Sequence, residues 1–146
     1  MKYFTITELS KSSTASRLGI KNEPNATEKK NLEALIENVL DPLREAYGKP
    51  IIVNSGFRCP KLNKAVGGSS TSQHMYAQAA DIRSVQDTVE ENKKIYDLII
   101  SLKLPFDQLI NEYNYDWVHV SYGPKHRRTK LKATRSNGKT IYTTVK

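Results

Sequence analysis

The order of the periodic segments most strongly constrains how this 146-residue chain can fold. Apolar residues at helical spacing follow residue 25 and predict a core-facing helix. Two short runs, "PIIVNSG" and "AADIRS", predict strands, and a second helical pattern follows them. "FDQLINEY" and "WVHVSY" are strand-like runs around "NYD", which predicts a hairpin. This order is not a regular βαβ alternation, so the sequence predicts an α+β fold.

The ends of the first predicted helix are marked by particular residues. Asn25 and Glu28 form a capping-box pattern at its start. Pro42 should kink or interrupt the helix, because it lacks an N–H and clashes with the preceding turn. Gly48 ends it.

A second helix is predicted after "AADIRS". Asp87 with Glu90 can cap it, and its apolar stripe would consist of Ile95, Leu98, Ile99 and Leu102. Between the two predicted strands, residues 57–73 form a stretch rich in Gly and Ser that we expect to be irregular. Irregular segments of this length inside compact domains usually carry function.

Size and composition indicate one soluble globular domain. Hydrophobic residues make up 38% of the chain and charged residues 26%, unlike a disordered tail. Cys59 is the single cysteine, which excludes an internal disulfide and a cysteine-rich zinc site. No run approaches the roughly 20 apolar residues of a membrane span, and the first residues do not resemble a secretory signal. We therefore expect a product made in the cytoplasm without a signal peptide.

The positive charge is concentrated at the C-terminal end. Net charge is +8, and residues 125–146 contain eight Lys and Arg but no acidic residue, so the whole excess lies there. "RSNGK" contains an Asn-Gly type I′ turn pattern, which predicts a two-stranded ribbon. We divide the chain into residues 1–124 and a basic hairpin extension of the same domain at 125–146, which includes His126. The hairpin would bind an anionic polymer, or alternatively be a solvated surface feature.

Three residues have the chemistry of a metal site. His74, Asp81 and His119 supply two imidazoles and one carboxylate, a set that suits catalytic zinc with a fourth position left for water. Either histidine alone is more often a packed or surface residue. Strand alternation places His119 on the face opposite Val118 and Val120.

Two carboxylates are candidates for proton transfer beside such a metal. Asp116 precedes His119 by three residues. In an ideal strand these two side chains would point to opposite faces, so Asp116 must lie in the turn. Glu112 is the reserve candidate, although an exposed strand residue is its simpler interpretation.

Three stretches, "SGFRCPKLNKAVGG", "SSTSQHMYAQAADI" and "DWVHVS", resemble peptidase family M15, the zinc D-alanyl-D-alanine carboxypeptidases and peptidoglycan endopeptidases of bacteria and phages. The family pattern Ser-x-His-x-x-Gly-x-Ala-x-Asp, followed by Glu or Asp-x-x-His, is matched by Ser72, His74, Ala79, Asp81, Asp116 and His119. The similarity covers about residues 3 to 122, and "FTITELSKSSTASRLGIKNEP" looks like a phage-associated branch.

One position departs from the pattern, because Ala77 stands where the family usually has Gly. The added methyl group disfavours a positive φ. We therefore expect either an αR or β conformation at Ala77, or a slightly redirected loop.

The resemblance implies a small central antiparallel sheet flanked by helices, as in the Hedgehog and DD-peptidase folds. It also implies zinc bound by His74, Asp81 and His119, with Asp116 as general base and acid and Arg58 stabilising the oxyanion. A surface or loop-bracing role is the alternative for Arg58. Ser72, Gln73 and Tyr76 would line the substrate groove, unless Ser72 and Gln73 only satisfy backbone groups.

The implied function is a zinc metallopeptidase that hydrolyses a peptide bond in peptidoglycan stem or cross-link peptides. It would be either a D-Ala-D-Ala carboxypeptidase or an endolysin-type endopeptidase. The alternative is a non-catalytic zinc-containing module that binds cell wall or nucleic acid; a metal-free DNA-binding protein would rest on charge alone. We expect a monomer that does not bind nucleic acid. It would reach the wall by phage-type release, or else act inside the cell.

Overall fold

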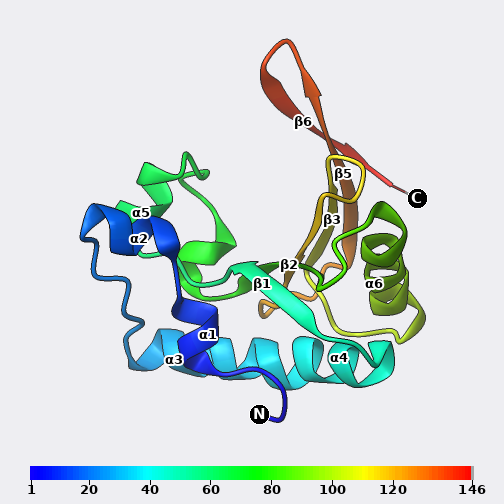
Figure 1. Ribbon diagram of the computed structural model, residues 1–146, viewed down its shortest axis with the longest axis horizontal. Coiled ribbons are helices and arrows are strands. Elements are labelled where there is room, and N and C mark those ends of the chain that lie inside the picture. Colours follow the sequence, from blue (N-terminus) through cyan, green and yellow to red (C-terminus); the bar gives the residue numbers. More distant parts are fainter. Residues whose placement is uncertain (146) are drawn as a thin grey trace.

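The computed structural model describes residues 1–145 and confirms the α+β architecture (Figure 1). Its six-stranded sheet has the order β1-β2-β4-β3-β5-β6. All neighbouring strands are antiparallel except β3 and β5, which are parallel. The strands are β1 Ile51–Ser55, β2 Ala79–Ser84, β3 Gln108–Glu112, β4 Trp117–Ser121, β5 Thr129–Ser136 and β6 Lys139–Thr144. The helices are α1 Ile6–Ser10, α2 Ser13–Leu18, α3 Ala26–Leu35, the π-helix η1 Ile36–Leu40, α4 Asp41–Tyr47, α5 Pro60–Ala65, the 3-10 helix η2 Gln73–Tyr76 and α6 Val89–Ser101.

The hydrophobic core lies between one face of the sheet and the helices α3, η1, α4 and α6. Ile82, Val118 and Val120 of the central strands have no exposed surface and belong to this core. From the helices they meet Leu35, Ile36, Val39, Leu40, Leu43, Ile95 and Ile99. Full burial of such a side chain contributes about 1.5–3 kcal/mol to the stability of the folded chain. Because strand side chains alternate, Asp81 of β2 and His119 of β4 lie on the opposite face of the sheet.

The first long helical segment begins as predicted and is interrupted near Pro42. Asn25 and Glu28 form a reciprocal capping box at the start of α3. The interruption is a π-helical segment, η1, directly before α4. Pro42 cannot donate to the carbonyl of Asn38 and would clash with it in a regular α-helix, so the wider turn relieves the conflict. Gly48 ends the segment in the left-handed conformation, with φ of 76°.

The stretch 57–73 was predicted to be irregular, and this prediction is wrong for residues 60–65. These residues form α5, which buries Leu62 and Asn63. Pro60 lies in its first turn, where a fixed φ favours helix and the missing N–H costs nothing. Six residues are too few to show helical periodicity, which is why the pattern did not reveal this helix.

The second predicted helix exists as α6, but its cap differs from the prediction. The Thr88 hydroxyl accepts the N–H of Glu91, whereas Asp87 lies in the preceding turn with a φ of 46°. Of the predicted stripe, Ile95 and Ile99 are fully buried, but Leu102 remains 39% exposed beyond the end of the helix.

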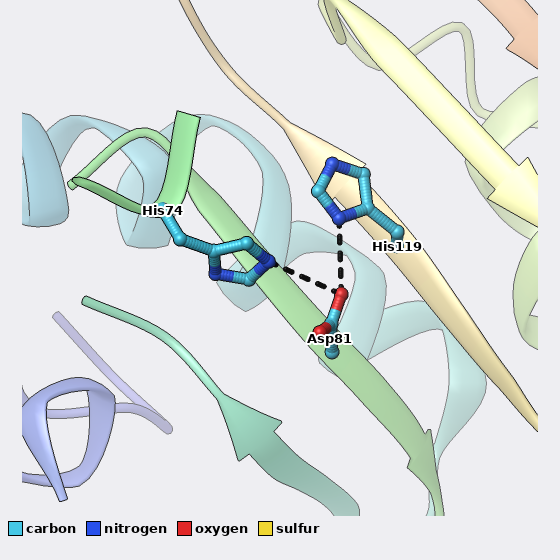
Figure 2. A group of neighbouring side chains, drawn as sticks. All are labelled: His74, Asp81 and His119. Carbon is cyan, nitrogen blue, oxygen red and sulfur yellow. Dashed lines mark hydrogen bonds and ion pairs between the residues drawn. The ribbon is translucent and has the colours of Figure 1, made fainter. Parts of the chain in front are cut away.

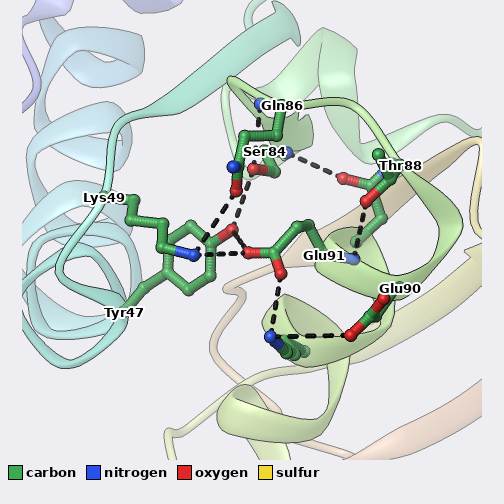
Figure 3. Close-up of polar contacts among 9 residues, drawn as sticks. Tyr47, Lys49, Ser84, Gln86, Thr88, Glu90 and Glu91 are labelled. Carbon is green, nitrogen blue, oxygen red and sulfur yellow. Dashed lines mark hydrogen bonds and ion pairs between the residues drawn. The ribbon is translucent and has the colours of Figure 1, made fainter.

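A buried carboxylate joins α6 to the start of the sheet (Figure 3). Glu91 accepts hydrogen bonds from Lys94 at 2.8 Å, Tyr47 at 2.5 Å and Lys49 at 3.0 Å. These bonds lower the pKa of Glu91 to about 2, so the group is ionised at neutral pH. The Tyr47 hydroxyl also contacts Ser84 at the end of β2. The network fixes α6 against the strand that carries Asp81.

The C-terminal residues form the predicted hairpin. Asn137 and Gly138 have φ of 50° and 76°, as a type I′ turn requires. β5 also pairs in parallel with β3, so the hairpin continues the central sheet and projects beyond it (Figure 1). Within residues 1–145, no helix has the length and apolar character needed to cross a membrane.

Asn92 in α6 links β2 to the turn between β3 and β4. Its side-chain oxygen accepts the N–H of Ser84 at 2.7 Å, and its amide donates to the carbonyl of Tyr115 at 2.9 Å. Asn92 is 1% exposed, so the groups it satisfies have little access to water.

We predict that Asn92→Ala lowers the free energy of unfolding by about 2–4 kcal/mol, because it leaves buried donors and acceptors unpaired. Denaturant unfolding measures the change. Asn38→Ala is the matched control: this exposed side chain bonds only within its own helical segment, and its removal should change stability by less than about 0.5 kcal/mol. Equal effects of the two substitutions would contradict the assigned role of Asn92.

Candidate active site

Three side chains from different elements converge on the face of the sheet opposite the core (Figure 2). Asp81 in β2 and His119 in β4 are direct partners in the antiparallel register. His74 comes from η2, the helical turn that precedes β2. His119 Nδ1 and His74 Nε2 lie 3.0 Å and 3.3 Å from the same oxygen, Asp81 Oδ1. The structure thus brings together the three residues predicted to bind metal.

The arrangement of the three donors fits a tetrahedral metal ion. All three ligand atoms lie within 4.8 Å of one another. A tetrahedral zinc ion with bonds of about 2.1 Å separates its ligand atoms by about 3.4 Å. The two imidazole nitrogens lie 3.0 Å and 3.3 Å from Asp81 Oδ1, close to that separation. Two nitrogens and one oxygen also leave a fourth position for water or substrate. The donor set and the spacing both suit zinc.

A backbone carbonyl orients His74. Its Nδ1 donates to the carbonyl of Gly56 at 2.7 Å, which places Nε2 on the side of Asp81. Gly56 cannot carry a side chain, because a Cβ there would lie 2.2 Å from the carbonyl oxygen of Leu9. The sequence indicated only a turn at this glycine, so its role in orienting a histidine was missed.

Asp81 remains ionised despite its burial. Burial alone raises the pKa of this carboxyl, but His74 and His119 hold the pKa well below its usual range. Arg58 Nη2 lies 3.4 Å from the second oxygen, Oδ2. The buried charge is therefore compensated on both sides of the carboxylate.

Arg58 is held in place by neighbours that the sequence did not suggest. Its Nε donates to Ser55 Oγ at 3.0 Å, and its Nη1 donates to Asn63 Oδ1 at 3.1 Å. Burial lowers the pKa of Arg58, although a guanidinium stays charged at any physiological pH. With the Asp81 contact, three of its five N–H groups are engaged, so two can serve another partner. Asn63 was missed because α5 was missed.

Glu112 lies on the same face of the sheet as the three donors. Ile110 is the register partner of His119, and Glu112 follows it by two residues, so both side chains share the face of His119. Glu112 is 7% exposed, so the simpler interpretation of it as an exposed strand residue is wrong. Burial, and then the charge of Asp81, raise its pKa to about 7.

Asp116 lies in the turn between β3 and β4, where its spacing from His119 required it to be. Its side chain is exposed, and its backbone N–H donates to the carbonyl of Glu112 at 3.0 Å. Its role in proton transfer stays a prediction.

The residues predicted to line the substrate groove differ in their surroundings. Ser72 caps η2 and accepts the N–H of His74 at 3.2 Å, which is the backbone-satisfying role. Gln73 donates from Nε2 to Asp107 at 2.8 Å. Tyr76, the last residue of η2, is 55% exposed and stays a candidate for substrate contact.

Ala77 corrects one expectation. The methyl group was expected to exclude a positive φ, yet Ala77 is left-handed, with φ of 59° and ψ of 35°. Left-handed geometry costs a non-glycine residue about 1–2 kcal/mol. The methyl group is fully buried in the core, which offsets part of this cost. The loop therefore keeps the glycine conformation without glycine.

The basic segment contributes to the support of the site. Arg127 donates from Nε and Nη2 to the two oxygens of Asp107, at 2.6 Å and 3.1 Å. Asp107 is 3% exposed and also accepts from Gln73, the neighbour of His74. Hydrogen bonds from Arg127 lower the pKa of Asp107. Arg127 is therefore not a free charge of the hairpin.

The position of Glu112 gives a testable effect of pH on stability. Below pH 4.5 its carboxyl is protonated in both folded and unfolded chains. As pH rises to about 7 the unfolded chain loses the proton first, so folded stability falls, and the loss is complete above that pH. We predict that Glu112→Gln raises the free energy of unfolding at about pH 8 by about 1–3 kcal/mol, with the gain absent near pH 4.5.

Denaturant unfolding in the presence of a chelator measures this gain. Asp116→Asn is the control, since an exposed side chain should change stability by less than about 0.5 kcal/mol. A Glu112→Gln variant less stable than the wild type at high pH would contradict the assignment.

Comparison with known proteins agrees with the resemblance of the motifs. The chain matches the Peptidase M15 family over residues 2–121. It is also 54% identical over 44 residues to the zinc D-Ala-D-Ala carboxypeptidase of Streptomyces albus G. That alignment covers 30% of this chain and only 17% of the relative. The family match spans most of the chain and includes all three converging donors, so this chain belongs to the Peptidase M15 family.

Proposed function

We propose that this protein is a zinc-dependent peptidase that hydrolyses peptide bonds of peptidoglycan, with His74, Asp81 and His119 as the zinc ligands. The observation that carries the proposal is the convergence of these donors at spacings suited to tetrahedral zinc. Membership of the M15 family supports peptidase chemistry. The partial relative, a zinc D-Ala-D-Ala carboxypeptidase, supports both the metal and the substrate class.

Zinc bound here supplies Lewis acidity, which polarises a carbonyl and lowers the pKa of water. The protein's own residues hold and orient the reacting groups. Gly56 fixes the ring of His74, and Arg58 compensates the charge of Asp81. The two free N–H groups of Arg58 are proposed to bind the carbonyl oxygen of the scissile bond as it gains negative charge.

Glu112 is the group that we propose to transfer the proton from water to the leaving amine. Its place on the metal-binding face and its burial support this role. A pKa near neutrality suits a group that must accept and then release a proton, and a nearby cation would bring this raised pKa back down toward its ordinary value. Asp116, which the family motif favours, is the competing candidate.

The donor assignment predicts one zinc per chain in the wild type. His74→Ala together with His119→Ala should abolish stoichiometric zinc, because a single carboxylate binds the ion weakly. Elemental analysis after dialysis measures the content, and His126→Ala is the control, since this histidine is exposed in the C-terminal segment. Zinc retained at one per chain in the double variant would refute the ligand set.

The two carboxylates can be separated by kinetics on purified muropeptides. Glu112→Gln should keep zinc and lower kcat by a factor on the order of 10² to 10⁴, because proton transfer is lost while the ligands remain. Asp116→Asn should change kcat by less than about tenfold. The reverse order of effects would assign the proton transfer to Asp116. Mass spectrometry of the products identifies the bond, distinguishing a D,D-carboxypeptidase from an endopeptidase. Zinc binding without hydrolysis would favour a binding module.

A further inference from the structure

The C-terminal hairpin lies outside the residues that match the family, yet it continues the face that carries the metal-binding donors. The registers of the paired strands define two rows of side chains across this face. The first row runs through Asp81, His119, Ile110, Leu131 and Thr144. The second runs through Trp117, Glu112, Ala133 and Tyr142. Register partners point to the same face, so Tyr142 stands at the end of the row that contains Glu112.

Tyr142 is separated from Glu112 by a single position of this row. Between it and Glu112 lies Ala133, a small residue that has no exposed surface although the core helices pack on the other side of the sheet. The larger side chains that flank Ala133 are placed to cover it. Burial, and then the charges of Glu112, Tyr113 and Asp81, raise the pKa of Tyr142. The phenol thus stays protonated within the field of the site's carboxylates, while Tyr142 as a whole remains 56% exposed.

The part of the hairpin that carries Tyr142 contacts the turn between β3 and β4. The Tyr113 hydroxyl and Thr140 Oγ1 are 2.5 Å apart. The Arg135 guanidinium lies 5.0 Å from the centre of the Tyr113 ring, and that ring packs edge-on against Trp117 at 5.6 Å. Thr140 and Tyr142 share one face of β6, so these contacts hold Tyr142 in a fixed position relative to Glu112.

We propose that Tyr142 is a substrate-contacting residue, whose hydroxyl donates a hydrogen bond to a carbonyl or carboxylate oxygen of the bound peptide while its ring packs against that peptide. An exposed tyrosine suits such a position, since it offers apolar area and one polar group at low entropic cost. The inference rests on the proposed function, because the peptide is the substrate of the metal centre. It places the far wall of the substrate site on the hairpin.

Kinetics on muropeptides with the full-length, zinc-loaded protein test this role. Tyr142→Ala should raise KM about tenfold and Tyr142→Phe about threefold, with kcat within about twofold and zinc content unchanged. Comparing the two variants separates the contribution of the hydroxyl to KM from that of the ring. Ile141→Ala is the matched control: Ile141 is 47% exposed and adjacent on the opposite face of β6, and its removal should leave KM unchanged. A KM for Tyr142→Ala within twofold of the wild type would overturn the proposal, as would an equal rise for Ile141→Ala.

A binding measurement separates this inference from the proposed hydrolysis. Calorimetric titration of the Glu112→Gln protein with a muropeptide should show a dissociation constant that rises about tenfold on adding Tyr142→Ala. If the wild type hydrolyses nothing but binds the muropeptide in a Tyr142-dependent manner, the contact stands and the proposed hydrolysis fails. If the peptide binds without dependence on Tyr142, or does not bind at all, the inference is refuted.

Discussion

The antiparallel pairing of β2 with β4 is the constraint on which the rest of the site depends. It places Asp81 directly opposite His119 on one face, and Ile82 opposite Val118 on the other. A slip of either strand by one residue would move its apolar side chain into water and its polar side chain into the core. The core contacts of Ile82 and Val118 therefore hold the register, and the register fixes the distance between two of the donors. Hydrophobic burial here determines polar geometry.

Three buried carboxyl groups, Asp81, Asp107 and Glu112, differ in how far their negative charge is compensated. Asp81 is compensated by two histidines and Arg58, and Asp107 by the paired nitrogens of Arg127. For Glu112 desolvation outweighs the attraction of its cationic neighbours, so its charged form is disfavoured in the folded chain. A group kept at some cost to stability beside a candidate metal-binding cluster is typical of functional sites. Its position is difficult to explain by packing alone.

Strong periodicity made much of the fold predictable. The capping box at Asn25, the paired strands around His119 and the Asn137–Gly138 turn all follow from local rules, because each is decided within a few residues. The three donors could be named from residue types and the family motif, and the structure brings them together.

The remaining features depend on contacts between distant segments. α5 was too short to show a periodic pattern. The parallel pairing of β3 with β5 cannot be predicted from any local sequence pattern. The left-handed Ala77 contradicts its residue preference because tertiary packing overrides it. Glu112 resembled an exposed strand residue until the register placed it on the same face as His119. In each case the deciding neighbour lies far away in the chain.

The bond between Arg127 and Asp107 has a consequence for the order of events during synthesis. Asp107 is fixed to Gln73 beside His74, and β5 must pair with β3 before Glu112 acquires its neighbour Ala133. A nascent chain emerges from the ribosome in sequence order, N-terminal part first. The residues around His74 and Asp81 therefore emerge well before the arginine and the strand that complete their surroundings. Translation must therefore proceed through the hairpin before the site can take its final form.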